Sequence, residues 1–211
     1  GASGFLGTEI CKELISRGHQ TIGTVFSERN AQVFMKNLPE AKTYLIDLST
    51  DFIKLENIFF ENQIDYVIHC AAMKHVNICQ NNPTRCIKTN LIGLSTDKAN
   101  NPSCIYGYSK KLMESSLLEK GYAIYKGVNF FGSGGSVIDI WEAQVSNGEE
   151  ITVNSQDTIR YFIKSDQVVS DILSNIDNSG VLLPLDVYKI SLHDLAKAFT
   201  KFHNHEKIRY F

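Results

Sequence analysis

Three glycines, spaced three residues apart, open this chain and lead straight into a helical pattern. Gly1, Gly4 and Gly7 precede a run whose apolar residues recur at helical intervals. The run reaches a helix stop at Gly18. Glycines at such a turn let the backbone approach a pyrophosphate, whose negative charge then lies at the N-terminus of the helix. The pattern predicts a dinucleotide-binding turn, and a glycine-rich connection without function is the alternative.

Strand-like and helix-like segments alternate along the rest of the chain. The segments expected to be strands are 21–26, 43–47, 65–72, 123–129 and 151–153. The segments expected to be helices are 8–18, 31–37, 52–62, 86–91, 137–146, 166–175 and 192–202. This alternation is typical of a Rossmann-type α/β fold, a doubly wound parallel sheet, here with a smaller C-terminal substrate-binding portion. We place the dinucleotide-binding domain at 1–130 and the substrate-binding portion mainly at 131–211, with some elements returning to the first domain.

Two features predict that parts of this fold are missing from the chain. A dinucleotide-binding fold needs a strand before its glycine turn, and here Gly1 comes first. Between Gly93 and Leu94 a helical stretch runs directly into the next strand. A crossover to a parallel strand normally takes about a dozen residues or more. We therefore expect a further segment between these two residues.

The composition excludes several classes of protein. The 211 residues carry a formal net charge of −2, which argues against nucleic acid or an acidic membrane as the main partner. No apolar run approaches the roughly 20 residues that cross a bilayer. The five cysteines include no C-x-x-C pair, which favours reduced thiols in a cytoplasmic compartment. We expect a cytoplasmic enzyme that forms a homo-oligomer and has no nucleic-acid or membrane partner.

A tyrosine and a lysine four residues apart indicate proton transfer. On a helix Tyr106 and Lys110 point the same way, one turn apart, where the ammonium favours the phenolate. Such a tyrosine can take a proton from a sugar or alcohol hydroxyl while a nicotinamide takes the hydride. Asp97 and Lys98 offer an acid and a base beside the same carbon. The Tyr-x-x-x-Lys spacing alone also arises by chance on surface helices, but together with the glycine turn it predicts a catalytic pair.

These motifs resemble those of the extended short-chain dehydrogenase/reductases that act on nucleotide sugars. The shared features are the glycine turn, the Tyr106 and Lys110 pair, and the small residues of His69-Cys-Ala71-Ala72. Narrower motifs are similar to those of the inverting UDP-N-acetylglucosamine 4,6-dehydratases (5-epimerising). They are His69-Cys-Ala-Ala-Met-Lys74-His75-Val, Ile87-Lys88-Thr89-Asn90 and Ser95-Thr96-Asp97-Lys98-Ala-Asn-Asn-Pro. The match is densest over 69–111 and covers most of the chain.

Lys98 distinguishes two classes within this group. Retaining 4,6-dehydratases carry Thr-Asp-Glu where this chain has Thr96-Asp97-Lys98. The resemblance implies that Tyr106 removes the C4 hydroxyl proton as hydride passes to the nicotinamide. A base then removes H5, Asp97 protonates the departing C6 hydroxyl, and hydride returns to C6. A lysine can deliver a proton to C5 from the other face, which gives the inverted product. A salt bridge to Asp97 or a surface position is the alternative for Lys98.

One departure from the family pattern concerns the sugar. The family has Gly-Ser-Arg-Gly-Ser where this chain has a glycine at 134, between Ser133 and Gly135, so an arginine expected near the substrate is absent. Arg160 is still expected to pair with the nucleotide diphosphate, because a guanidinium binds phosphate oxygens bidentately. The departure bears on which sugar is bound more than on the type of reaction.

The end of the predicted strand 21–26 favours NADP as cofactor. Ser27 and Arg29 can accept a 2′-phosphate, whereas Glu28 keeps NAD as the alternative. The residues expected to contact the cofactor are Gly1, Ser3, Gly4, Phe5, Leu6, Ser27, Arg29, Asp47, Leu48, Ala71, Ala72, Lys74, Asn90, Tyr106 and Lys110.

The expected substrate is UDP-N-acetylglucosamine or a related UDP-amino sugar. The residues expected to contact it are Lys74, His75, Thr96, Asn129, Ser136, Val137 and Arg160. No metal is expected, because two histidines in a polar tail, His203 and His205, are more often solvated. Two alternatives stay open. A nucleotide-sugar 4-epimerase or reductase of the same superfamily needs no C5 base, and a catalytically silent dinucleotide-binding protein needs no intact tyrosine–lysine pair.

Overall fold

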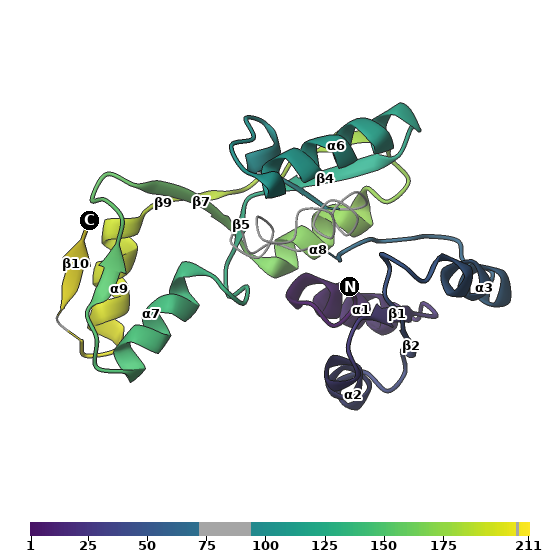
Figure 1. Cartoon of the computed structure of the whole chain (residues 1–211), viewed down its shortest axis with the longest axis horizontal. Helices are drawn as coiled ribbons and strands as arrows, with labels where there is room; N and C mark the ends of the chain where they lie inside the picture. The colour runs from purple at the N-terminus through teal and green to yellow at the C-terminus, as the bar shows by residue number, and fades with distance from the viewer. Residues whose placement is uncertain (72–93, 206) are drawn as a thin grey trace. The chain divides into compact units, whose positions relative to one another are not determined.

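The computed structural model describes residues 1–71, 94–205 and 207–211, which form two compact units (Figure 1). Unit 1 comprises Gly1–Gly127 and Asp166–Leu183, and unit 2 comprises Val128–Ser165 and Pro184–Phe211. Each unit is therefore built from two separate stretches of the chain.

Unit 1 alternates helices with short strands. Its elements are α1 (Phe5–Ser16), β1 (Ile22–Val25), α2 (Glu28–Asn37), β2 (Lys42–Leu45), α3 (Phe52–Asn62), β3 (Ser95–Thr96), the 3₁₀ turn η1 (Asp97–Ala99), α6 (Ile105–Glu119), β4 (Ala123–Gly127), α8 (Ser165–Ser174) and β8 (Gly180–Leu182). β1 pairs with β2 and β3 pairs with β4, which in turn pairs with β8, all in parallel. The prediction of a Rossmann-type α/β fold with parallel strands is confirmed.

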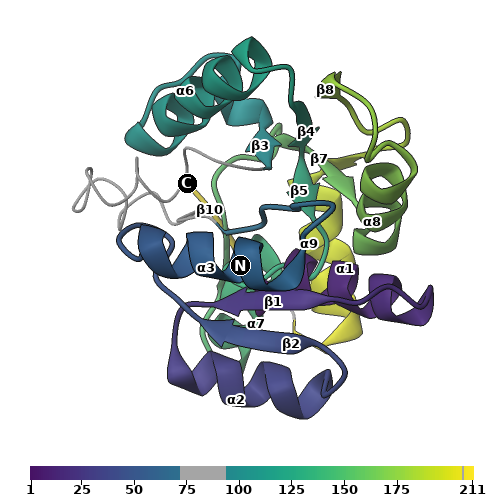
Figure 2. The ribbon, with the colours of Figure 1, turned by 90° about the vertical axis from the view of Figure 1, so that its right-hand side faces the viewer.

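The packing of α2 against β1 and β2 requires a glycine at position 23 of β1. Figure 2 shows β1 and β2 side by side next to α2. The core between them contains Val25 of β1 and Phe34 of α2. A Cβ atom at Gly23 would lie 2.6 Å from the Phe34 ring, so the glycine lets this ring pack on the strand.

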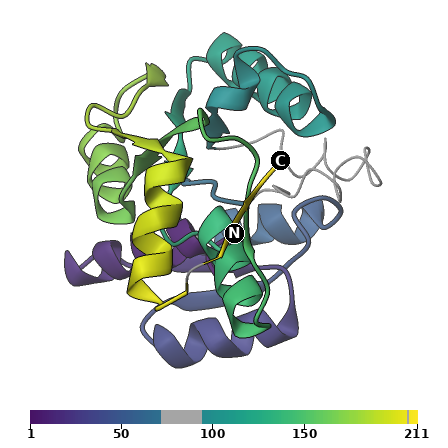
Figure 3. The same ribbon diagram turned by 90° about the vertical axis from the view of Figure 1, so that its left-hand side faces the viewer.

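Unit 2 is smaller and mixed in strand direction. Its elements are β5 (Asn129–Phe130), α7 (Val137–Ser146), β6 (Ile151–Val153), β7 (Ile159–Ile163), β9 (Tyr188–Ser191), α9 (Leu192–Phe202) and β10 (Ile208–Tyr210). β7 lies between β5, which is parallel to it, and β9, which is antiparallel. α7 and α9 lie side by side (Figure 3), and the rings of Trp141 and Phe199 are 5.5 Å apart between them.

The strands depart from the sequence prediction more than the helices do. The strand predicted at 65–72 is wrong over its described part, because residues 65–71 form no strand. The strand predicted at 123–129 is two strands, interrupted at Val128 where the chain passes into unit 2. Three helices, at 52–62, 137–146 and 192–202, have the predicted bounds.

Candidate active site

The glycine turn forms a close-packed cradle at the N-terminus of α1. A Cβ atom at Gly7 would lie 2.3 Å from the Gly1 carbonyl oxygen, and one at Gly1 would lie 2.3 Å from the Ala71 nitrogen. Gly4 is the N-cap of α1, and no side-chain hydrogen bond caps the helix there. The N–H groups of its first turn are therefore available to an anion. The cradle fits the pyrophosphate of a dinucleotide.

The residues expected around this cradle differ in how exposed their side chains are. Gly1 and Ala71 are brought into contact, and Ser3 and Leu48 are partly exposed. Leu6 is only 5% exposed, so its side chain belongs to the core and its backbone alone can face a ligand. Phe5 is exposed.

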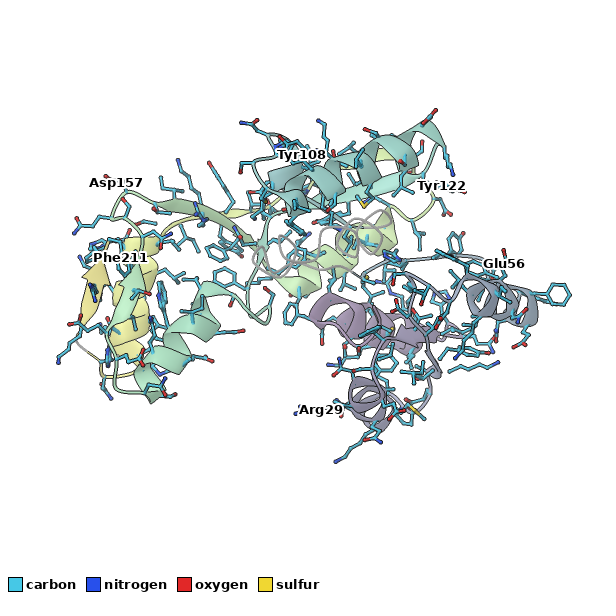
Figure 4. All side chains as sticks on the ribbon, in the orientation of Figure 1. Arg29, Glu56, Tyr108, Tyr122, Asp157 and Phe211 are labelled. Atoms are coloured by element: carbon cyan, nitrogen blue, oxygen red, sulfur yellow. The ribbon has the colours of Figure 1, made fainter. Side chains whose placement is uncertain are left out.

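Ser27 and Arg29 lie at the start of α2, directly after β1. The Ser27 hydroxyl accepts a hydrogen bond from the Asn30 backbone N–H at 3.4 Å, so it caps the helix. Arg29 is exposed and extends from α2 (Figure 4). Glu28 is exposed beside them.

Asp47 is part of a tight turn after β2. Its Oδ1 accepts hydrogen bonds from the Ser49 backbone N–H at 2.9 Å and from the Ser49 hydroxyl at 2.6 Å. These bonds fix the carboxylate in place, a role that the sequence analysis did not foresee.

The predicted acid and base lie on η1. The Thr96 hydroxyl donates to Asp97 Oδ1 at 2.8 Å, and Lys98 Nζ lies 3.5 Å from the same oxygen. About half of each charged side chain is exposed, at 49% for Asp97 and 50% for Lys98. Thr96 itself is buried, so its hydroxyl orients Asp97.

The tyrosine–lysine pair lies on α6, which packs against η1. Tyr106 is partly exposed in the first turn of the helix, whereas Lys110 is 1% exposed. Between them, a Cβ atom at Gly107 would lie 2.8 Å from the Lys98 carbonyl oxygen. The glycine therefore allows the helix to touch η1, and unit 1 brings the Asp97–Lys98 pair next to the start of α6.

The pKa of Cys70, the residue before Ala71, depends on the charged groups near the cradle. Burial raises the pKa of the Cys70 thiol to about 12, and the positive charge of Lys110 acts in the opposite direction. Lys110 is therefore near Cys70, whose carbonyl carbon would lie 2.6 Å from a Cβ atom at Gly1. Lys110 and the glycine turn therefore both lie near the segment that contains Cys70 and Ala71.

The sequence analysis missed two charged residues next to the site, the buried Glu114 and the partly buried Lys126. Glu114 follows Lys110 by four residues on α6, and Lys126 lies on β4; they form an ion pair at 3.0 Å. The spacing of Tyr106, Lys110 and Glu114 is the signal that points to one helix face. Nothing in the sequence marks Lys126.

Four of the expected substrate residues lie in unit 2. The Asn129 amide donates to the Tyr161 carbonyl at 2.8 Å, which ties β5 to the strand that carries the exposed Arg160. Ser136 precedes α7, and the Asp139 carboxylate accepts a hydrogen bond from the Gly135 backbone N–H beside it. Val137 is the first residue of the same helix.

The remaining predicted site residues, Ala72, Lys74, His75 and Asn90, lie outside the described residues. Within the described part of the chain, no cluster of three or more His, Cys, Asp or Glu side chains could hold a metal ion. In the same part, no helix is long and apolar enough to cross a membrane.

Comparison of the sequence with known proteins finds relatives that act on nucleotide sugars by name. An inverting UDP-N-acetylglucosamine 4,6-dehydratase of Campylobacter jejuni is 30% identical over 175 aligned positions, which take in 69% of this chain and 52% of that protein. A UDP-glucose 4-epimerase of Rickettsia canadensis is 32% identical over 127 positions, with 47% of this chain and 37% of that protein covered. The chain spans about a third to two thirds of the length of the curated relatives it matches.

The fold has counterparts among solved structures. The X-ray structure of Pen from Bacillus thuringiensis matches the whole chain with a TM-score of 0.90 at 22% identity, over 77% of its own length. The resemblance to extended short-chain dehydrogenase/reductases is confirmed. The family model described as "Polysaccharide biosynthesis protein" matches residues 1–94 and 91–210. The chain belongs to this polysaccharide biosynthesis protein family.

Proposed function

We propose that this protein is an inverting 4,6-dehydratase of UDP-N-acetylglucosamine or a closely related UDP-amino sugar. The observation that carries the proposal is the packing of the Asp97–Lys98 turn against the first turn of α6, which holds Tyr106 and Lys110. An enzyme that only moves hydride at C4 needs Tyr106 and Lys110 but not the Asp97–Lys98 pair. Relatives named as inverting UDP-N-acetylglucosamine 4,6-dehydratases support the same assignment.

A nicotinamide dinucleotide, when bound, supplies the acceptor and donor of hydride. The cradle of Gly1, Gly4 and Gly7 would hold its pyrophosphate at the N-terminus of α1. We propose NADP, with Ser27 and Arg29 at the 2′-phosphate, because a guanidinium suits a phosphate group. NAD is the alternative that Glu28 would favour.

The chain's own residues move the protons. Tyr106 takes the proton of the C4 hydroxyl, and the nearby ammonium of Lys110 stabilises the phenolate. The C4 ketone then acidifies H5, which Lys98 removes while Asp97 protonates the C6 hydroxyl, so that it leaves as water. Protonation of C5 on the opposite face, again by Lys98, sets the inverted configuration. Thr96 keeps the Asp97 carboxyl oriented throughout.

The remaining polar contacts would position the nucleotide sugar. We propose that Arg160 pairs with the diphosphate, since its side chain is exposed on β7 and carries a bidentate donor. Asn129, Ser136 and Val137 are proposed to contact the rest of the ligand. The choice of sugar is proposed to depend on the segment around Gly134, where the arginine of the family pattern is missing.

A 4-epimerase is the second candidate, because UDP-glucose 4-epimerases are also among the relatives. One experiment separates the two. The protein is incubated with UDP-N-acetylglucosamine in deuterated water, and the product is analysed by mass spectrometry and NMR. Loss of one water with deuterium at an inverted C5 supports the dehydratase. An isomer of unchanged mass, inverted at C4, would show that the protein is an epimerase.

A further inference from the structure

An ion pair between a buried glutamate and a partly buried lysine is bonded to the segment that carries Asp97 and Lys98. Glu114 of α6 is 6% exposed, and its Oε1 lies 3.0 Å from Nζ of Lys126 on β4. The same carboxylate accepts a hydrogen bond from the Ser95 hydroxyl. Removing a charge from water is costly unless its partner and its remaining hydrogen bonds compensate, and Glu114 has both in Lys126 and Ser95.

The ion pair is connected to both ends of the turn. Ser95 lies two residues before Asp97 and is the residue opposite Lys126 in the parallel register of β3 and β4. Lys126 Nζ also donates to Asn100 Oδ1 at 2.7 Å. Asn100 closes η1, because its backbone N–H donates to the Asp97 carbonyl at 3.1 Å. The segment that carries Asp97 and Lys98 is thus bonded to one ion pair at its beginning and at its end.

The other end of this network is the helix of the tyrosine–lysine pair. Tyr106, Lys110 and Glu114 follow one another at intervals of four residues, so their side chains leave the same side of α6. α6 therefore meets the turn at two places, through Glu114 and through the tight contact of Gly107 with the Lys98 carbonyl. Two fixed contacts along one helix define the position of the turn relative to Tyr106.

We propose that Glu114 and Lys126 are positioning residues that hold the Asp97–Lys98 pair in register with Tyr106 and Lys110. The proposal rests on the proposed function, in which C4 oxidation depends on Tyr106 and dehydration depends on Asp97 and Lys98. Glu114 and Lys126 act through Ser95 and Asn100. Their loss displaces the dehydrating pair from the oxidising pair, so the second step slows more than the first.

The kinetic test compares the two steps in the same variants. The variants are Glu114→Gln, the double variant Glu114→Met with Lys126→Met, and a matched control, Glu119→Gln, on an exposed position of α6. The double variant removes both charges, so it protects the fold from an unpaired buried ion. C4 oxidation is followed by the absorbance of the reduced nicotinamide, and dehydration by the mass of the product.

We expect the ratio of dehydration rate to oxidation rate to fall about 10–100-fold in Glu114→Gln and in the double variant, because small misplacements of a reacting group have effects of this size. Glu119→Gln should keep the wild-type ratio. Equal losses in both steps would mean that the ion pair only supports the fold, and this would overturn the proposal.

A second measurement needs no substrate. Amide hydrogen exchange is followed on peptides that cover 95–100 and 123–127 in the wild type and in the same variants. Faster exchange over 95–100, with 123–127 unchanged, supports the positioning role. Exchange over 95–100 that equals the wild type overturns it. Failure of the wild type to dehydrate UDP-N-acetylglucosamine would refute the proposed function, and the exchange data would still decide the positioning role.

Discussion

At the residue scale, the position of Lys98 is compatible with both interpretations of its sequence motif, a catalytic base and a salt bridge to Asp97. Its ammonium lies 3.5 Å from Asp97 Oδ1, so it is a salt-bridge partner, yet half of its side chain is exposed. An ion pair this exposed contributes about 0–1 kcal/mol. The contact therefore opens at little cost when a sugar ring enters, and the salt bridge is compatible with a role as base.

We predict that Lys98→Ala stops the reaction after C4 oxidation. The variant should lose both deuterium incorporation at C5 and the inverted product, because removal and return of the C5 proton depend on the same amine. A loss of about 10²–10⁴-fold is expected for an acid–base group. Product analysis by NMR in deuterated water measures it.

Tyr106→Phe provides the comparison for this variant. It should block the reaction one step earlier, before the C4 ketone forms, while UDP-sugar binding measured by calorimetry stays close to wild type. Inverted, labelled product from Lys98→Ala at a comparable rate would show that another group is the base.

At the scale of elements, the glycine turn before α1 depends on glycine because backbone atoms approach one another closely there. At Gly7 there is no space for a side chain, because a Cβ atom would lie 2.3 Å from the Gly1 carbonyl oxygen. At Gly4 the space is larger, because a Cβ atom would lie 3.3 Å from the same oxygen. The backbone must move in the first case, whereas a shift of a few tenths of an ångström suffices in the second.

We predict a graded effect of alanine at these two positions. Gly7→Ala should destabilise the protein by about 1–3 kcal/mol, as overpacking does, and should abolish retention of the dinucleotide. Gly4→Ala should do less of both. Thermal unfolding and analysis of the nucleotide released on denaturation measure the two effects. Full retention of nucleotide by Gly7→Ala would contradict the proposed cradle.

At the scale of the whole molecule, the buried thiol of Cys11 and the partly buried thiol of Cys70 make stability depend on pH. Burial raises the pKa of Cys11 to about 11 and that of Cys70 to about 12. An unfolded thiol titrates near about 8.5, so above that pH the folded state binds more protons than the unfolded state. The stability that these groups contribute is complete below about pH 8.5 and is lost as the pH rises through the folded pKa values.

The free energy of unfolding should therefore fall from about pH 8.5 up to about pH 11 for Cys11 and about pH 12 for Cys70, by at most about 1.4 kcal/mol per pH unit for each thiol. Denaturant unfolding at several pH values measures this slope. Cys11→Ala and Cys70→Ala should each make it shallower. A slope unchanged in both variants would assign the alkaline loss to other groups.

The connection at Gly93 and Leu94 also belongs to the whole molecule. The family model matches the chain in two stretches that meet at 91–94, and the alignment with the Campylobacter enzyme has more positions than this chain has residues in it. These matches support our proposal that the complete protein has a further segment between Gly93 and Leu94.

Trypsin offers a direct test, because Lys88 and Lys98 flank the junction. A peptide of residues 89–98 should be absent from a digest of the protein isolated from its natural source, and peptides of other mass should join the two sides. Detection of the continuous peptide would refute the proposal. That the protein is a cytoplasmic homo-oligomer stays a prediction.

The sequence by itself determined the bounds of three helices and the spacing of the proposed site residues. The bounds at 52–62, 137–146 and 192–202 are recovered because helical hydrogen bonds join neighbours in the chain, so the apolar period is a local signal. The motif Thr96-Asp97-Lys98 and the Tyr106–Lys110 spacing are likewise local.

Only the tertiary structure decided whether residues 65–71 and 180–182 form strands and which charged side chains pair with each other. β8 exists because it pairs with β4, whose partner residues lie 57 positions earlier, and residues 65–71 form no strand although their composition predicts one. Glu114 and Lys126 pair because α6 and β4 bring them together, and the low exposure of a charged side chain cannot be read from its residue type. Strand pairing and the burial of charge depend on partners that are distant in sequence, and no local pattern specifies those partners.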